Sequence, residues 1–277
     1  MINDIDALPA KAAMLRRMAL EAALKAKKGH LPPAFSWADI AAVLFYGDML
    51  RYRPGAPDWA ERDRFLLSKG HACLTLFAAL ADIGHFDRAE LDRFAADGAM
   101  LAGHPDTNIP GAELVSGSLG HGLGIGVGQA LAARLDGKDW RTVVLLGDGE
   151  CYEGSVWEAA MLAGHRRLSN LVAIVDRNRL SATNFTETIV ALEPFADKWR
   201  AFGWRVVEVD GHDHAALIDT FAPLLRVRDA AAAAPTVVIA NTVKGKGVPF
   251  MENHPDWHHR MPKGDEIDAA RAALAAA

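Results

Sequence analysis

The chain has only two cysteines and no long hydrophobic run. Cys73 and Cys151 lie far apart, without the CxxC spacing of a metal or redox site or the cysteine density of a disulfide-stabilised domain. No stretch approaches the roughly 18 consecutive apolar residues of a membrane span. The first thirty residues mix acids and bases where a signal peptide would have an apolar core. We therefore expect a cytoplasmic protein that does not bind a membrane.

Charge of either sign is not concentrated along the chain. It has 30 basic and 35 acidic residues, a net charge of -5, and no basic run that could follow a phosphate backbone. Nucleic acid is therefore not an expected partner. Because 277 residues without an internal repeat suit one core, we expect a single domain over residues 1–277. The alanine tract at 230–234 is predicted to be a linker or a helix end.

Short β-branched apolar runs alternate with segments of helical periodicity. The predicted strands are RFLLS (64–68), TVVLLGD (142–148), NLVAIVD (170–176), WRVVEVD (204–210) and PTVVIANT (235–242). The predicted helices lie near 13–28, 39–50, 73–83, 88–95, 120–135, 155–165, 194–202 and 213–225, with a loop at 97–117. Ser36 or Asp39 is expected to cap the second of these helices. Strands that alternate with helices form a parallel sheet covered on both faces. The predicted fold class is α/β, with three layers and a mostly parallel central sheet.

Three of the predicted strands end in aspartate. Ligands bind such sheets beyond the carboxyl ends of the strands, so Asp148, Asp176 and Asp210 are expected at one edge. A turn or helix cap is the simpler interpretation of a strand-end aspartate, and we prefer it for Asp210. Asp148 stands between two glycines, which let a metal and phosphates approach the backbone. Because magnesium takes hard oxygen ligands, Asp148 and Asn178 are candidate ligands.

A glycine-rich segment, GSLGHGLGIGVG, covers residues 117–128. It does not fit the GxGxxG fingerprint of dinucleotide-binding proteins. We interpret it as a turn with free amide groups, at Gly117 to Gly120, followed by a helix. Amides at the start of a helix suit a diphosphate. Close helix packing is the alternative explanation of the glycines, and one segment can do both.

Taken together, the motifs resemble those of the transketolase family. GDG at 147–149 followed by Asn178 is similar to the thiamine-diphosphate signature. Further motifs keep transketolase order over nearly the whole chain: GH (29–30), LSKGHA (67–72), GHP (103–105), GSLG (117–120), GDGECYEGSVWEA (147–159), KGKG (244–247) and WH (257–258). The resemblance implies the thiamine-diphosphate-binding fold, with thiamine diphosphate and Mg²⁺ as cofactors.

The resemblance also implies roles for single residues. Magnesium would be held by Asp148, Asn178 and the carbonyl oxygen of Leu180. The residues implied to bind the cofactor are His71, Gly117, Leu119, Gly149, Asn178, Lys244 and His258. Two departures from the family pattern stand out. His121 replaces a common glutamine, and the segment 31–33, predicted to be an extended loop, has Pro33 where a phosphate donor would stand.

Five residues are implied in catalysis. His30 and His104 would face the hydroxyl groups of the substrate, with His258 at the cofactor, because a near-neutral imidazole can donate, accept or move a proton. Glu153 and Glu158 would share a proton between two active sites across a dimer, and stabilisation of a helix start by charge is their alternative role. The histidines expected to be only structural or exposed are His85, His165, His212, His214, His254 and His259.

The expected function is that of an N-terminal subunit of a split transketolase, because the chain ends soon after His258 whereas full-length transketolases continue. It would belong to a carbohydrate-metabolism transferase that moves a two-carbon ketol unit from a ketose or ketose phosphate to an aldose. A separate C-terminal subunit would complete the active site in a hetero-oligomer with a dimeric core. The alternatives are a haloacid-dehalogenase-type phosphatase with Asp4 and Asp6 as its nucleophile motif, a related thiamine-dependent synthase, and a non-catalytic regulatory or scaffold subunit.

Overall fold

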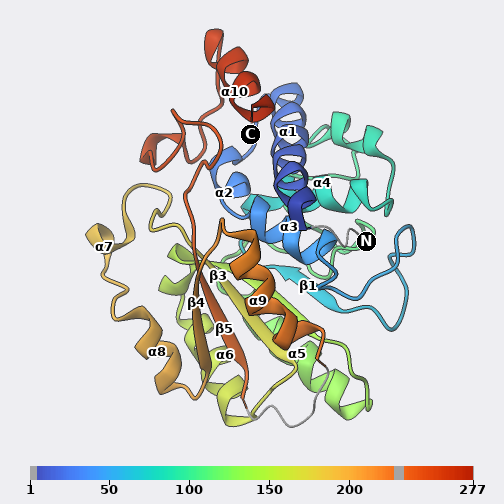
Figure 1. Cartoon of the computed structure of the whole chain (residues 1–277), viewed down its shortest axis with the longest axis vertical. Helices are drawn as coiled ribbons and strands as arrows, with labels where there is room; N and C mark the ends of the chain where they lie inside the picture. Colours follow the sequence, from blue (N-terminus) through green and yellow to red (C-terminus); the bar gives the residue numbers. More distant parts are fainter. Residues whose placement is uncertain (1–4, 228–233, 277) are drawn as a thin grey trace.

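A five-stranded parallel sheet forms the centre of the protein (Figure 1). The structure is a computed structural model that describes residues 5–227 and 234–276. The strands are β1 (Arg64–Leu67), β2 (Thr142–Gly147), β3 (Leu171–Arg177), β4 (Arg205–Asp210) and β5 (Thr236–Asn241). They lie in the order β1-β2-β3-β5-β4, and each neighbouring pair is parallel. The predicted strands and their parallel arrangement are confirmed.

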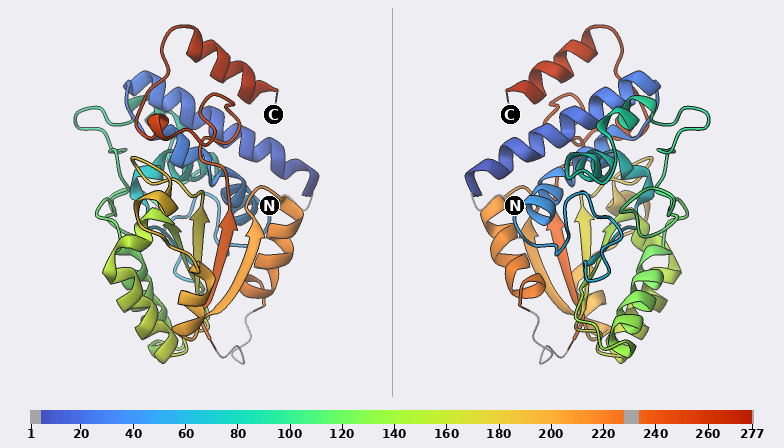
Figure 2. Two further views of the ribbon diagram at one scale, coloured as in Figure 1. Left: turned by 90° about the vertical axis from the view of Figure 1, so that its left-hand side faces the viewer. Right: turned by 90° about the vertical axis from the view of Figure 1, so that its right-hand side faces the viewer.

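The strands send alternate side chains to two separate cores. Val143 and Leu145 of β2 belong to one core, and Val144 and Leu146 belong to the other. Figure 2 shows helices on both sides of the strands. The first core is shared with α1 (Leu8–Ala26), α3 (Ala38–Tyr46), α4 (Cys73–Asp82) and α9 (His214–Leu225), and the second with α5 (Gly122–Leu135), α6 (Gly154–His165) and α8 (Phe195–Ala201). The predicted three-layer α/β class is confirmed.

The remaining elements complete the fold. They are α2 (Leu31–Phe35), α7 (Thr186–Ile189), α10 (Asp265–Ala275) and 3₁₀ turns at Ile5–Ala7, Gly70–Ala72, Arg88–Arg93, Gly149–Tyr152 and Pro255–Trp257. α10 packs against α1, where Arg271 and Glu21 form an ion pair at 2.7 Å. Among the described residues, no helix has both the length and the apolar character needed to cross a membrane.

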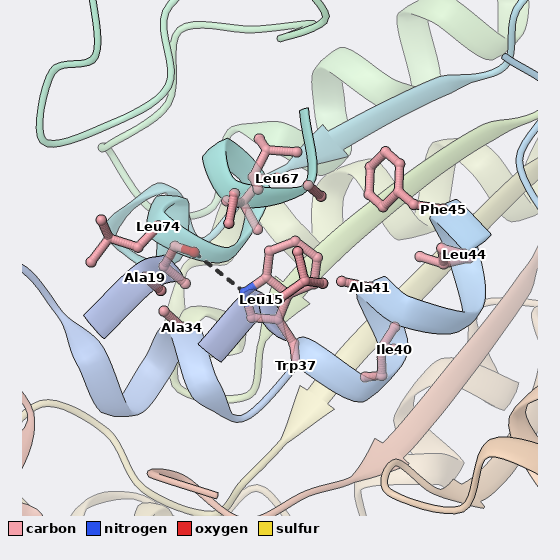
Figure 3. Close-up of a cluster of buried hydrophobic side chains, with 14 of the residues drawn as sticks. Leu15, Ala19, Ala34, Trp37, Ile40, Ala41, Leu44, Phe45, Leu67 and Leu74 are labelled. Carbon is pink, nitrogen blue, oxygen red and sulfur yellow. Dashed lines mark hydrogen bonds between the residues drawn. The ribbon is translucent and has the colours of Figure 1, made fainter. Parts of the chain in front are cut away.

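Trp37 anchors the helices of the first core to the sheet. Its fully buried indole lies among side chains of α1, α3, α4 and β1, including Leu15 and Leu67 (Figure 3). The indole Nε1 donates a hydrogen bond to the carbonyl oxygen of Ala72 at 3.3 Å. The turn at Gly70–Ala72, which carries His71, is thereby held against the start of α3.

Two predictions near the start of the chain are wrong for local reasons. Residues 31–33 do not form an extended loop but begin α2. Pro32 and Pro33 fit its first turn, where backbone N–H groups have no helical partner. Neither Ser36 nor Asp39 caps α3, which starts after Trp37 without a side-chain cap. Their side chains bond Asp176 and Arg16 instead.

Other boundaries differ by a few residues. The first helix begins at Leu8 rather than near residue 13, and the helix predicted at 39–50 ends at Tyr46. The segment predicted as a helix at 88–95 is a 3₁₀ turn over Arg88–Arg93. The loop predicted at 97–117 is confirmed. Residues 230–233 of the alanine tract and Asp4 lie outside the described residues.

The strand-end aspartates share one edge of the sheet, as predicted. Gly147 pairs with Asp176 across β2 and β3, which brings Asp148 beside Asp176. Asp210 pairs with Asn241, the last residue of β5. Its Oδ1 accepts a hydrogen bond from the His212 amide at 2.8 Å, so the turn interpretation of Asp210 is confirmed.

The glycines of α5 have two different environments. A Cβ atom on Gly126 would lie 2.4 Å from Cγ2 of Val144 in β2, and one on Gly122 would lie 2.3 Å from Oγ of Ser68. A Cβ atom on Gly124 or Gly128 would meet nothing within 4 Å. The predicted close packing is therefore confirmed for one face of the helix, which lies directly on side chains of the sheet.

We predict that Gly126→Ala is less stable than Gly128→Ala. Both variants gain the same helix propensity, so the difference between them isolates the contact with Val144. Overpacking costs about 1–3 kcal/mol in a filled core, and we expect a difference of that size. Denaturant unfolding of the two variants measures it. Equal free energies of unfolding would contradict close packing of α5 on β2.

Candidate functional site

The carboxyl ends of the strands open into a cavity of about 350 Å³. Each residue that the sequence assigns to the cofactor or the metal lines this cavity. They are His71, Gly117, Leu119, Asp148, Gly149, Asn178, Leu180, Lys244 and His258. These residues come from segments far apart in the sequence, and the register of the parallel strands brings them together.

Asp148 lies at the end of β2 and is buried. Its Oδ1 accepts the Gly149 amide at 2.7 Å, and its Oδ2 accepts the Arg179 amide at 2.5 Å and Arg177 Nη1 at 3.2 Å. Burial, followed by the nearby Asp176 carboxylate, raises the pKa of Asp148, although Arg177 opposes this. A further cation beside Asp148 would therefore stabilise its charged form.

Asn178 and Leu180 offer neutral oxygen atoms beside Asp148. Asn178 Oδ1 accepts the Leu180 amide at 3.1 Å, and the Leu180 carbonyl accepts Lys244 Nζ at 3.0 Å. Within the described ranges, no group of three His, Cys, Asp or Glu residues could hold a metal. A carboxylate, an amide and a carbonyl are nevertheless a ligand set that magnesium takes when phosphate oxygens and water complete its shell.

Lys244 is a buried cation whose hydrogen-bond partners are neutral. Its Nζ donates to the carbonyl oxygens of Leu180 and Ser181 at 3.0 and 2.8 Å. Lys244 forms no ion pair in the part of the chain that the structure describes. Burial, followed by the charge of Lys69, lowers the pKa of Lys244 to about 7. An anion in the cavity would restore the charged form of this lysine.

Lys69 is a site residue that the sequence analysis missed. It is buried, lines the same cavity and forms an ion pair with Asp176. Asp176 also accepts hydrogen bonds from Ser36 and Thr242. Burial opposes ionisation of Asp176, but Lys69 outweighs it and lowers the pKa of this aspartate. The available signal was the position of Lys69 inside LSKGHA, two residues before His71.

Glu150 was also missed as a structural part of the site. Its buried carboxylate accepts hydrogen bonds from Ser68 Oγ, from the Gly120 amide at 2.9 Å and from the Gly147 amide at 3.0 Å. Burial raises the pKa of Glu150 despite these bonds. The prediction of free amides throughout Gly117 to Gly120 is therefore wrong at Gly120. Its amide ties the glycine turn to the end of β2.

A histidine cluster forms one wall of the cavity. The ring centroids of His30, His71 and His258 lie 5.3 to 5.4 Å apart. Burial, then the nearby His259, lowers the pKa of His30 to about 4, and burial, then Lys244, lowers the pKa of His258 to about 3. Burial also lowers the pKa of His71. Neutral imidazoles can each donate and accept a hydrogen bond at pH 7.

A second cavity, of about 410 Å³, shares His30 and His71 with the first. His104 lines it, and the ring centroid of His104 is 6.5 Å from that of His30. His259 lines it too, with its ring centroid 4.5 Å from that of His30. His259 was expected to have no role, and this contact with His30 was missed. The only signal in the sequence was that His259 directly follows WH at 257–258.

Three residues singled out in the sequence lie apart from the cavity linings. Glu153 and Glu158 are exposed and line neither of the two cavities. His121 is also exposed, and its Nδ1 lies 3.2 Å from the Leu119 carbonyl oxygen. Pro33 does line the first cavity, where it has no N–H group to donate.

The chain is similar to transketolases over nearly its whole length. Residues 9–277 match the family model described as transketolase, thiamine diphosphate binding domain. The chain is 40% identical over 267 residues to an apulose-4-phosphate transketolase subunit of Phocaeicola vulgatus, covering 96% of this chain and 93% of that protein. It is 39% identical over 273 residues to 6-deoxy-6-sulfo-D-fructose transketolase subunit SqwG of a Clostridium species, covering 98% and 97%.

A solved structure gives the same result for the fold. Transketolase from Campylobacter jejuni superposes with a TM-score of 0.90 at 29% sequence identity, covering 98% of this chain and 43% of that one. The chain therefore spans less than half the length of this solved transketolase.

The lowered pKa of Lys244 predicts how anion binding depends on pH. Below about pH 7 the lysine is charged with or without a ligand, so affinity for inorganic diphosphate with magnesium is highest there. Above this pH, binding requires uptake of a proton, and affinity falls by up to about tenfold per pH unit. Lys244→Arg stays charged and should remove this slope. Calorimetric titration across pH 6–9 of both proteins is the test, and parallel profiles would contradict the assignment.

Proposed function

Because the chain belongs to the transketolase family, we propose that it is the N-terminal, cofactor-anchoring subunit of a split transketolase. In this proposal residues 1–277 form one thiamine-diphosphate-binding domain. The observation that carries the proposal is the cavity at the strand ends, which gathers Asp148, Asn178, Leu180 and Lys244. Relatives of nearly the same length support it, because two of them are named as transketolase subunits.

The lining of the first cavity fits a diphosphate with magnesium. Lys244 is a buried cation with only carbonyl partners, and Asp148 is a buried carboxyl with a raised pKa. Gly149 has no side chain to fill the space beside them. A Cβ atom on Gly149 would come within 3.3 Å of Ser181. Asp148, Asn178 and the Leu180 carbonyl would hold magnesium. Lys244, His71, His258, Gly117, Leu119 and Gly149 would contact the cofactor. Bound thiamine diphosphate would supply the nucleophilic carbon that cleaves the ketose.

The histidines would handle protons on the sugar. His30 and His258 are neutral near pH 7 because burial lowers their pKa values, so each can pass a proton to or from a hydroxyl group. His104 lies beside Gly117, because a Cβ atom added to this glycine would come within 3.3 Å of the His104 ring. These side chains would orient the ketose in the same cavity lining that anchors the cofactor.

The second cavity is the proposed place of the sugar or sugar phosphate. It adjoins the first through His30 and His71, and Lys28 and His259 line its other parts. Imidazole and ammonium groups suit hydroxyl and phosphate oxygens. In the reaction, a two-carbon ketol unit would pass from a ketose or its phosphate to an aldose.

A C-terminal subunit would complete the active site. Transketolase subunits among the relatives support a hetero-oligomer, for which we propose a dimeric core in the cytoplasm. Exposed apolar side chains, Ile125 on α5 and Met161 and Leu162 on α6, suit burial by another chain. Glu153 and Glu158 are exposed in the single chain, so the proton sharing proposed for them requires such burial.

The family match excludes one of the three alternative functions and leaves two. The haloacid-dehalogenase-type phosphatase is wrong, because the transketolase family model covers residues 9–277. A non-catalytic scaffold subunit is the second candidate, and Pro33 favours it because it cannot donate to a phosphate. A related thiamine-dependent synthase is the third. Turnover of the chain with its partner subunit distinguishes them.

We predict that Asp148→Asn abolishes the activity of the reconstituted enzyme. The chain and its C-terminal partner, with thiamine diphosphate and Mg²⁺, should convert a ketose phosphate and an aldose into new sugars. Loss of the carboxylate removes the charged magnesium ligand, and we expect cofactor affinity to fall at least about 100-fold. Asp136→Asn, at an exposed position after α5, is the control. Unchanged cofactor binding by Asp148→Asn would refute the proposed site.

We predict that His259→Ala raises the KM for the sugar and leaves cofactor affinity unchanged. His259 lines the second cavity but not the first. Loss of a hydrogen bond to a neutral partner corresponds to about a fivefold to tenfold change in KM. His254→Ala changes an exposed histidine of the same segment and is the matched control. If both variants have the parental KM, the sugar lies elsewhere.

A further inference from the structure

His212 joins two parts of the fold that are distant in sequence. It follows β4 and is largely buried, with 13% of its side chain exposed. Its Nδ1 lies 2.7 Å from Oδ2 of Asp39 in α3. On the other side of the ring, Nε2 accepts a hydrogen bond from the Val243 amide at 2.8 Å. Val243 directly precedes Lys244 in the cavity lining.

The partners of His212 determine which nitrogen carries the proton. Asp39 is paired with Arg16 of α1, and the nearby His212, His214 and Arg16 overcome its burial and lower its pKa. An ionised carboxylate can only accept, so Nδ1 of His212 must donate to it. The amide of Val243 can only donate, so Nε2 must offer its lone pair. Both bonds form only in the neutral Nδ1–H tautomer.

The Val243 bond restrains the segment that carries Lys244. Thr242, on the other side of Val243, bonds Asp176, and the Lys244 carbonyl accepts the Asn253 amide at 2.9 Å. The hydrogen bond that the Val243 amide donates to His212 fixes the backbone between these two anchors. A lysine side chain is long and flexible, so the direction of its ammonium group depends on a fixed backbone.

We propose that His212 is a positioning residue for the cofactor site. Asp39 holds His212 in one tautomer, and His212 in turn fixes the Val243 amide and thereby directs Lys244 into the cavity. The inference rests on the function proposed above, in which Lys244 contacts the diphosphate there. His214 also approaches Asp39, with its Nε2 3.2 Å from Oδ1, but it has no hydrogen bond to residues 242–245 within the described ranges. The two histidines therefore differ in function although they share a carboxylate.

Three substitutions separate positioning from general packing. Asn in place of His212 puts its amide nitrogen near the position of Nδ1, which keeps the Asp39 bond and loses the Val243 bond. Gln puts an oxygen near the position of Nε2, which keeps the Val243 bond. His214→Asn alters the other histidine beside Asp39 and serves as the matched control.

The experiment measures thiamine diphosphate saturation of the full chain with Mg²⁺ and its partner subunit, together with kcat and thermal unfolding. We expect His212→Asn to raise the half-saturating cofactor concentration about 10- to 100-fold, with kcat at saturation close to that of the parent. We expect His212→Gln to stay within about threefold of the parent and His214→Asn to match it, because both keep an acceptor for the Val243 amide.

Two results would overturn the proposal. One is parental cofactor affinity in His212→Asn, and the other is an equal loss in His212→Gln and His212→Asn. If His212→Asn does not fold, ¹⁵N NMR of the parent protein tests the proposal by showing which imidazole nitrogen of His212 carries the proton. The Nδ1–H tautomer supports the proposal, and the Nε2–H tautomer or the imidazolium ion overturns it. A parent complex that binds no cofactor refutes the proposed function itself, whereas a parent that binds normally beside unaffected variants refutes only the role of His212.

Discussion

The buried ion pair between Lys69 and Asp176 is the interaction on which the site depends. Asp176 stands at the end of the central strand β3, fully buried and beside a second buried acid, Asp148. A carboxylate in such a place is costly unless a cation and hydrogen bonds compensate it. Lys69, Ser36 and Thr242 supply that compensation. Because Lys69 is used in this way, Lys244 has only carbonyl partners and remains available for an external anion.

Burial then sets the protonation of the groups around the cavity. It raises the pKa of Asp148 and lowers those of Lys244, His30 and His258. Burial thus favours the neutral forms of these four side chains until a ligand brings its own charges. A magnesium ion beside Asp148 and a diphosphate beside Lys244 would each restore a charged form. This complementarity is the physical reason for assigning a metal diphosphate to the site, and His212 extends it by fixing the backbone beside Lys244.

The sequence predicted much of this arrangement, and its failures have identifiable causes. Alternating apolar runs predicted the five strands because a parallel sheet buries both faces of each strand. The motifs predicted the cavity lining because strand ends meet at one edge. Lys69 and Glu150 were missed because their roles arise from partners in distant segments, and the place of Lys69 inside LSKGHA does not name its partner Asp176. The segment at Pro32 was predicted as a loop because proline opposes a helix interior, whereas it fits the first turn.

The central claim is that Asp148, Asn178, Leu180 and Lys244 together hold a magnesium diphosphate. A crystal structure of the chain with its partner subunit, thiamine diphosphate and Mg²⁺ tests it most directly. The account predicts magnesium in contact with Asp148, Asn178 and the Leu180 carbonyl, and the Lys244 ammonium turned from the carbonyl oxygens to the diphosphate. A diphosphate bound away from these residues, with Lys244 still on Leu180 and Ser181, would contradict it.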